Sequence, residues 1–441
     1  MRIRNFCSVF FRTMVFIVLF FNYSSSFAAT DNPFSNLQSY QLKNGLRVVL
    51  LPRHRIPRVA IGWVTDAGAA NEPVGQSGIA HMLEHMMFKG TTKVDAQRYD
   101  TLYEMNGEVG GNAYTTYDRT AYYLSVPANK IELAFWLESD RLLDPQFTQF
   151  ESERKVVLEE RRSRIESSPM SQADYDFSHE YWKGTPFQHV VIGSNEDIKN
   201  FTTNDLKDFF KRYYTPRHIT LVVVGDFSAQ KIKPLIKAYF GRLPVSQPFA
   251  DAPINSQPNQ VRIEKKMPAP TMVWFRYSTP SKKQDDFYTF RVLAELMNAK
   301  VAPLYKQLVQ THVTTFSQAS TYSNAYFGQF NLFAMVNPPN TPEDVEAKLR
   351  TILSSYENAI NSKQLANAKQ SLILQYQAGM QSNMAILQTL LRSVYFKSGF
   401  KNLGSYPQRI NAVTALKVEQ AVKSYLQPNQ ASVFTNERTT V

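Results

Sequence analysis

The sequence predicts an α+β fold built from two halves of similar plan. Short β-rich segments bounded by Gly and Pro are mixed with longer segments of helical periodicity, and the helices are grouped together. From about residue 261 onward, the chain repeats the order of strands and helices of its first half. The 441 residues, 43% hydrophobic and 20% charged, suffice for two or three domains with sizeable cores.

A polar stretch rich in Pro predicts a linker at 244–260, between a domain at 29–243 and a second domain at 261–441. The expected elements of the first domain are strands at 46–51 and 59–64, a helix that starts after Ser77, a helix at 96–105, strands at 110–116 and 120–126, helices at 130–143 and 151–165, a strand at 219–225 and a helix at 228–240. Those of the second domain are strands within 261–278, a helix at 285–299, strands near 314–335, long helices between about 342 and 398, and a final helix and strand.

Residues 1–28 have the features of a secretory signal peptide. Arginines precede an apolar run at 14–21, and small residues follow it, with cleavage expected after Ala28. The alternative, an uncleaved anchor, is disfavoured because a membrane span needs about 20 apolar residues. We expect an exported protein, periplasmic in a bacterial source, with no stable membrane anchor after cleavage.

Composition disfavours several other classes of protein. The only cysteine, Cys7, lies in the signal segment, so the exported chain should contain no disulfide and no reactive thiol. The formal net charge is +12, or +9 without residues 1–28, and the basic residues are scattered rather than interleaved with aromatic side chains. This pattern favours solubility and a weak attraction to acidic peptides or surfaces, and it indicates no nucleic-acid binding.

The most informative local pattern is H-x-x-E-H at residues 81–85, in a chain that has only 7 histidines. On a helix, His81 and His85 project from one face a turn apart, so that both imidazoles can bind one divalent metal ion. Glu84 lies on the shoulder of that face, where it can accept a proton from a metal-bound water. H-x-x-E-H and its inverse H-E-x-x-H are both metallopeptidase signatures.

The surroundings of this pattern favour a buried helix. Ser77 is expected to be its N-cap, and the segment that follows is largely apolar. Buried polar groups need partners, and a metal ion would satisfy both histidines at once. The alternative is a helix whose histidines are hydrogen-bonded in the core while Glu84 is solvated.

A catalytic zinc ion usually takes three protein ligands and one water, so a further ligand is required. The remaining histidines show no paired spacing, but residues 151–162 have a strong helical pattern. Glu153 and Glu160 share one face of this helix, with Val156 and Val157 between them. The alternation of Glu with Arg and Lys is equally typical of an exposed, ion-paired helix, so spacing alone leaves Glu160 undecided.

Together these motifs resemble a known family. The pattern H-x-x-E-H-x-x-F-x-G-T at 81–91, the segment G-G-N-A-Y-T at 110–115 and the pattern E-R-x-V-V-x-E-E at 153–160 are similar to those of the pitrilysin- or insulinase-type (M16) zinc peptidases, also called inverzincins. That family includes insulin-degrading enzyme and the mitochondrial processing peptidase. The chain looks like its short, two-domain bacterial form.

The resemblance implies two similar α+β domains, each a mostly antiparallel sheet with helices packed on one face, and a substrate that lies between them. It implies one zinc ion per chain with His81, His85 and Glu160 as ligands. It assigns the role of general base to Glu84 and places Glu153 as a carboxylate behind the ligands. The family likeness, and not the spacing, selects Glu160 over Glu159 as the ligand.

The residues that bind substrate in the family are only partly present in this sequence. Asn112, Ala113 and Tyr114 match the family's substrate-binding strand. Members active alone or as homodimers usually carry, in the second half, a segment resembling L-x-x-x-L-R-x-x-x-x-x-x-Y, whose Arg and Tyr hold the substrate and the oxyanion. The matching stretch here has Val309 and Phe316 at these positions, and neither can donate a side-chain hydrogen bond. We therefore expect a homologous partner subunit, in a heterodimer, that supplies Arg and Tyr; a homodimer is the other arrangement.

Two functions of different classes are compatible with these observations. The first is a zinc-dependent metalloendopeptidase that hydrolyses unfolded peptides. The second is a non-catalytic assembly or peptide-binding subunit on the same fold. The missing Arg and Tyr favour the second function, whereas the complete set of metal and base residues favours the first.

Overall fold

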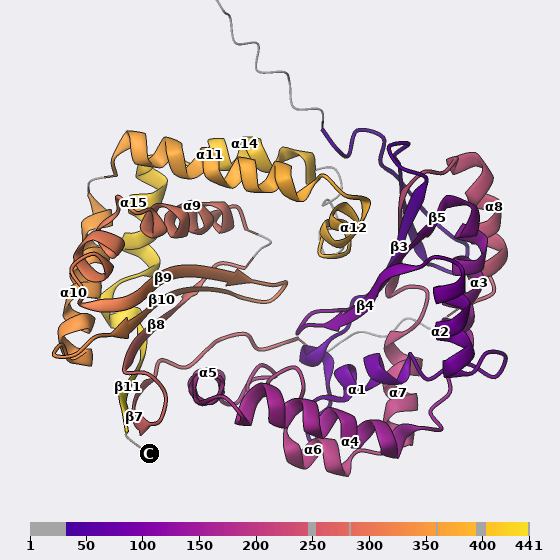
Figure 1. Ribbon diagram of the computed structural model, residues 1–441, viewed down its shortest axis with the longest axis horizontal. Coiled ribbons are helices and arrows are strands. Elements are labelled where there is room, and N and C mark those ends of the chain that lie inside the picture. Colours follow the sequence, from indigo (N-terminus) through magenta and orange to yellow (C-terminus); the bar gives the residue numbers. More distant parts are fainter. Residues whose placement is uncertain (1–31, 246–252, 282–283, 359, 394–402, 440–441) are drawn as a thin grey trace, which may run out of the picture.

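The computed structural model describes residues 32–245, 253–281, 284–358, 360–393 and 403–439 (Figure 1). The expected signal peptide with Cys7, and part of the expected linker, lie outside these residues. None of the helices in the described ranges combines the length and the apolar character that crossing a bilayer requires.

The first half is organised around a six-stranded sheet with the strand order β1-β2-β6-β3-β5-β4. Neighbouring strands are antiparallel except β2 and β6. Because β4 lies at one edge, one side of its backbone pairs with no other strand of the described chain. The strands are β1 (Gln38–Gln41), β2 (Arg47–Pro52), β3 (Arg58–Thr65), β4 (Val109–Thr115), β5 (Thr120–Pro127) and β6 (Ile219–Gly225).

This sheet is buried on both faces because its central strands carry apolar residues at consecutive positions. In β2, Val48 and Leu50 belong to a core with the helices of the first half, whereas Val49 and Leu51 belong to a core on the opposite face. Strand β6 is buried at every position. Such continuous apolar runs are typical of strands that are covered on both sides.

Helices of the first half cover one face of the sheet and form its main core. They are α1 (Ile79–Met86), α2 (Ala96–Met105), α3 (Ile131–Leu143), α4 (Phe150–Arg161), α6 (Asn195–Asn200), α7 (Thr203–Tyr213) and α8 (Ala229–Phe240). Helix α5 (Pro169–Tyr181) belongs to other clusters, which include residues of the second half. The strands and helices expected in this half are confirmed; β1 was not predicted, and neither were the helices α5, α6 and α7. Their signals were the capping residues Ser168, Ser194 and Thr202, whose side chains accept hydrogen bonds from the first turns.

The second half contains a five-stranded sheet with the order β7-β11-β8-β10-β9, in which only β7 and β11 are parallel. The α+β class with mostly antiparallel sheets is therefore confirmed. The strands are β7 (Arg262–Met267), β8 (Met272–Thr279), β9 (Thr314–Ser323), β10 (Gly328–Val336) and β11 (Ser432–Arg438). The helices are α9 (Asp286–Asn298), α10 (Pro342–Ser354), α11 (Ser362–Gly379), α12 (Asn383–Leu391), α14 (Tyr406–Asn411) and α15 (Ala415–Tyr425).

Each half contributes one helix to the sheet of the other half. Helix α12 lies against β3 and β6, and its buried residues Leu387 and Leu391 close the second face of the first sheet (Figure 1). In the opposite direction, Phe177 of α5 packs on Phe434 of β11 in the second sheet. This exchange makes the two halves structurally interdependent, which the repeated plan of the sequence does not indicate.

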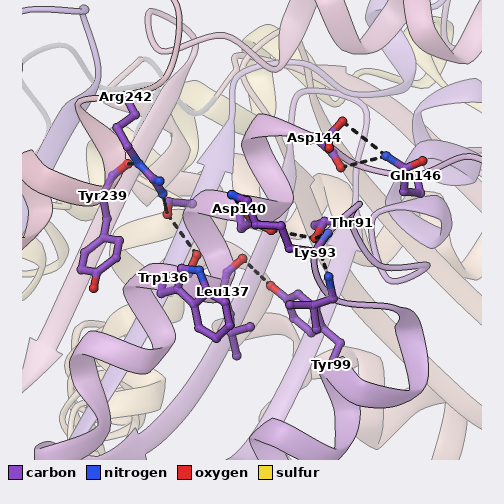
Figure 2. Close-up of polar contacts among 12 residues, drawn as sticks. Thr91, Lys93, Tyr99, Trp136, Leu137, Asp140, Asp144, Gln146, Tyr239 and Arg242 are labelled. Carbon is purple, nitrogen blue, oxygen red and sulfur yellow. Dashed lines mark hydrogen bonds and ion pairs between the residues drawn. The ribbon is translucent and has the colours of Figure 1, made fainter.

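The loop that follows α1 is joined to α3 by hydrogen bonds and an ion pair. Thr91 donates a hydrogen bond to the buried Asp140 at 2.6 Å, and Lys93 forms an ion pair with the same carboxylate at 2.7 Å (Figure 2). Tyr99 of α2 donates to the Leu137 carbonyl of α3 at 2.5 Å. Thr91, the last residue of the 81–91 motif, thus holds the loop beyond α1 against α3.

Replacing Leu387 with Ala should destabilise the protein by about 2–5 kcal/mol, because it opens a cavity between α12 and the first sheet. Urea denaturation measures the effect. Leu374→Ala on α11 is the control, since Leu374 is 53% exposed and should change the free energy of unfolding by no more than about 0.5 kcal/mol. Equal stabilities of the two variants would contradict the role given to α12.

Candidate metal centre and active site

Helix α1 begins at a different cap from the one expected. The N-cap is Gly78, in a left-handed conformation with φ of 93°, so the expectation that Ser77 caps the helix is wrong. The Ser77 hydroxyl donates instead to Asp197. The backbone amides of Gly78 and Ala80 donate to the carboxylate of Glu72 at 2.9 and 3.0 Å. These two hydrogen bonds fix the start of α1.

Helices α1 and α4 bring three potential metal ligands together. Nε2 of His81 lies 3.8 Å, and Nε2 of His85 lies 3.3 Å, from Oε2 of Glu160. All three ligand atoms lie within 4.8 Å of one another. In a tetrahedral zinc site with bonds of about 2.0–2.1 Å, the ligand atoms are separated by about 3.3 Å. The observed spacing needs only a small contraction to reach that geometry.

The polar atoms of this cluster fit a bound cation. Oε2 of Glu160 is buried and has no hydrogen-bond partner in the described structure, an arrangement that a metal ion would satisfy. Nδ1 of His85 is hydrogen-bonded to Oε1 of Glu153 at 2.8 Å, which leaves its Nε2 for a metal. Two imidazoles and one carboxylate are also a common ligand set of catalytic zinc.

The surroundings set suitable protonation states for two of the ligands. Burial lowers the pKa of His81 to about 4, and the neighbouring His85 adds to this effect, so His81 is neutral at pH 7. Burial also acts to lower the pKa of His85, but contacts with Glu160 and Glu153 outweigh it and raise this pKa. The contact with His85 lowers the pKa of Glu160 despite burial. A neutral His81 and an ionised Glu160 are the forms that bind metals.

Glu84 lies in the same cavity with properties that suit a general base. Burial raises its pKa to about 7, although the Thr115 hydroxyl, which donates to Oε2 of Glu84 at 2.5 Å, acts in the opposite direction. A base whose pKa lies near the working pH transfers protons efficiently. Because Thr115 is the last residue of β4, the carboxylate is also linked to the edge strand.

The two faces of α4 distinguish its neighbouring glutamates. Glu160 points towards the histidines, with 20% of its side chain exposed. Glu159 is 62% exposed and pairs with Arg162. Glu153, about two turns earlier, is buried and forms an ion pair with Lys89 at 2.5 Å in addition to its contact with His85. The charge pattern of this helix thus contains a solvated face and a separate face turned towards α1.

The cluster lines a cavity of about 530 Å³ beside the edge strand β4. Asn112, Ala113 and Tyr114 of β4 also line it. All described lining residues belong to the first half, and neither Val309 nor Phe316 is among them. Phe316 is 43% exposed on β9. Within the described chain, the second half therefore contributes no Arg or Tyr side chain to the cavity.

Sequence reasoning missed four residues that support this site: Glu72, Lys89, Thr115 and Arg164. Lys89 and Thr115 lie inside the motifs singled out above, but the motif letters do not show their contacts. Nη2 of Arg164 lies 2.5 Å from Oε1 of Glu160. Their separation of four positions is the usual spacing of an ion pair along a helix, and this was the available signal.

The fold and this site define a zinc-peptidase-like protein, and two family descriptions match the chain. "Insulinase (Peptidase family M16)" matches residues 47–193, and "Peptidase M16 inactive domain" matches residues 200–372. The zinc protease PqqE of Helicobacter pylori is 30% identical over 330 residues, which cover 73% of this chain and 74% of that protein. The chain therefore belongs to the M16 family of peptidases.

Another relative is similar in sequence, and solved structures share the fold of this chain. The β subunit of the mitochondrial-processing peptidase of Neurospora crassa is 29% identical over 227 residues, which are 50% of this chain and 46% of that one. A crystal structure titled as a protease from Helicobacter pylori has a TM-score of 0.83 at 24% identity and covers 91% of this chain and 99% of its own. The periplasmic protease PqqL from Escherichia coli has a TM-score of 0.74 at 21% identity, covering 92% of this chain and 48% of its own.

Glu153→Gln should weaken zinc binding by about 10–100-fold, because a neutral amide accepts a hydrogen bond from Nδ1 of His85 less strongly than a carboxylate does and so orients the imidazole less well. Competition with a chromogenic chelator measures the affinity. Glu151→Gln on the same helix is the matched control, since that side chain is 76% exposed and neither it nor its ion-pair partner Arg154 lines the metal-site cavity. If both variants bind zinc as tightly as the wild type, Glu153 has no such role.

Proposed function

We propose that this chain is the metal-bearing subunit of a zinc-dependent endopeptidase that hydrolyses unfolded peptides. The observation that supports this most strongly is the presence of Glu84 beside His81, His85 and Glu160 in one cavity. Three side chains suited to hold one metal ion and a fourth suited to move a proton are what peptide hydrolysis requires. A purely structural subunit has no need of all four.

The chemistry divides between the metal ion and Glu84. Zinc, held by His81, His85 and Glu160, would lower the pKa of its water to about 7 and polarise the scissile carbonyl. Glu84 accepts the proton of the attacking water and returns it to the leaving nitrogen. Thr115 holds one oxygen of Glu84, which leaves the other for this transfer.

The edge strand β4 is the proposed binding surface for the peptide. Asn112, Ala113 and Tyr114 line the cavity, and the outer side of β4 pairs with no strand of the described chain. An extended peptide can add to such an edge through main-chain hydrogen bonds, with little dependence on its sequence. Only an unfolded segment can adopt that conformation, so folded proteins are poor substrates.

A homologous partner subunit is part of the proposal. Val309 and Phe316 stand where the family usually has Arg and Tyr, and the described part of the second half adds neither residue type to the cavity. The loss of one oxyanion donor typically costs a factor of about 10²–10³ in rate. A heterodimer whose second subunit keeps Arg and Tyr restores these donors. A homodimer of this chain would not.

We also propose how the subunit is processed and where it works. The chain is exported, and residues 1–28 are removed after Ala28. The mature protein works in the periplasm with one zinc ion, as a metal-binding domain at 29–243, a linker at 244–260 and a domain without a zinc motif at 261–441. The PqqL structure, whose title calls that protein a periplasmic protease, supports this location by analogy.

The alternative is a non-catalytic assembly or peptide-binding subunit on the same fold. The observation that favours it is the absence of Arg and Tyr from positions 309 and 316. In that case the cavity would bind peptides without cleaving them.

Glu84→Gln should keep the fold and the zinc ion but lower the kcat/KM of the assembled complex by about 10²–10⁴-fold, because the proton acceptor is lost. A fluorogenic peptide assay and metal analysis of the same samples measure the two properties. Glu159→Gln, on the solvated face of α4, is the control and should leave both unchanged. A Glu84→Gln complex that cleaves as well as the wild type would refute the assignment of the base.

The purified chain alone should bind one zinc ion but cleave peptides slowly. Addition of a homologous subunit that carries Arg and Tyr should raise the rate by about 10²-fold or more. Size-exclusion chromatography with light scattering would establish which species is assayed. Full activity of a verified homo-oligomer would show that the partner requirement is wrong.

A further inference from the structure

A π-helical turn follows directly after the helix that carries Glu160. Helix α4 runs into the turn Arg162–Glu166, in which the amide of Ser167 donates to the carbonyl of Arg162 at 3.0 Å. Such turns change the direction of the side chains that follow and are frequent at functional sites. Here the turn places Arg164 on the lining of the metal-site cavity.

Arg164 differs from the other cationic residue of this lining. Lys89 is 23% exposed, and its ammonium is held by the buried Glu153. The side chain of Arg164 is 64% exposed, and one contact, at 2.5 Å, joins it to Oε1 of Glu160. A guanidinium has five N–H donors, so this contact leaves most of them for a ligand.

Arg164 lies close to the potential metal ligands. Its guanidinium is 2.5 Å from one oxygen of Glu160, and its side chain lines the same cavity as His81 and Glu84. The guanidinium is therefore near enough to interact with charge that develops in this cavity. Its contact with Oε1 also leaves Oε2 of Glu160 turned towards the histidines.

Peptide hydrolysis in this cavity requires a hydrogen-bond donor to the oxyanion. Peptide hydrolysis passes through a tetrahedral oxyanion, and hydrogen-bond donors aimed at it supply much of the catalytic effect. The described second half of this chain adds no Arg or Tyr to the cavity. Arg164 is a guanidinium from the first half at the same cavity.

We propose that Arg164 is a substrate-contacting residue, whose guanidinium, supported by Glu160, donates a hydrogen bond to the scissile carbonyl oxygen as negative charge develops on it. This inference rests on the proposed function. If Arg164 has this role, the chain itself provides one hydrogen-bond donor to the oxyanion, and a partner subunit provides the further donors. The competing role is purely supportive, in which Arg164 only orients Glu160.

The test measures binding rather than turnover, so it needs no partner subunit. The zinc-loaded chain is titrated with a phosphinic peptide, whose anionic tetrahedral group resembles the transition state, and zinc affinity is measured separately by chelator competition. Arg164→Gln should weaken binding of the phosphinic peptide by about tenfold or more at saturating zinc, because a charge-assisted hydrogen bond is lost. Arg164→Lys should recover part of the loss, since it keeps the charge but not the planar donor group.

Two controls separate the competing roles. Arg162→Gln removes a guanidinium of equal exposure, 64%, which pairs with Glu159 outside the cavity, and it should change binding by no more than about twofold. In a Glu84→Gln background, an amide peptide of matched sequence should lose less affinity through Arg164→Gln than the phosphinic peptide does. This difference indicates a contact that strengthens with the developing charge.

Three results would overturn the inference. They are unchanged binding of the phosphinic peptide by Arg164→Gln, a loss that disappears once zinc is saturating, and failure of the zinc-loaded wild-type chain to bind the phosphinic peptide at all. Failure of the wild-type chain to bind zinc is a separate outcome, and it would overturn the proposed function together with this inference.

Discussion

The site depends on one constraint: two imidazoles and a carboxylate face one another in a largely buried space, with no hydrogen-bond partner for Oε2 of Glu160 in the described structure. Polar groups in such surroundings are costly unless something pairs with them. The neighbouring structure holds the cluster in place. Glu72 fixes the start of α1, the contacts of Thr91 with α3 fix the loop beyond its end, and Glu153 joins α1 to α4. A divalent cation would satisfy these groups, which is the basis of the metal site that we propose.

The two halves have similar orders of strands and helices but contribute differently to the structure. The first half provides every described residue of the metal-site cavity. The second half provides α12, which covers the back of the first sheet, and a surface on which α5 packs. Within the described ranges, the second half thus covers the back of the first sheet and adds no side chain to the cavity. This division agrees with the match of residues 200–372 to a domain described as inactive.

Periodicity and spacing, which are local properties, predicted the α+β class, most strands and helices, and the group His81, Glu84 and His85, whereas Glu160 came from the family likeness. Spacing did not separate Glu160 from Glu159, since both sit in one charged run and only the packing of α4 on α1 tells the two faces apart. The cap at Gly78 was missed because the carboxylate that replaces Ser77 comes from Glu72, outside the helix. The packing of α12 on the first sheet depends on tertiary structure, for which local patterns give little signal. The spacing of Glu160 and Arg164 indicated an ion pair but not its place in the cavity. The roles of the site residues stay predictions.

The most direct measurement of the central claim is anomalous X-ray scattering at the zinc absorption edge, from crystals of the chain grown with zinc. The account predicts one strong peak about 2.0–2.2 Å from Nε2 of His81, Nε2 of His85 and an oxygen of Glu160. A peak at another position only, or no peak at this cluster in crystals that contain zinc, would contradict it.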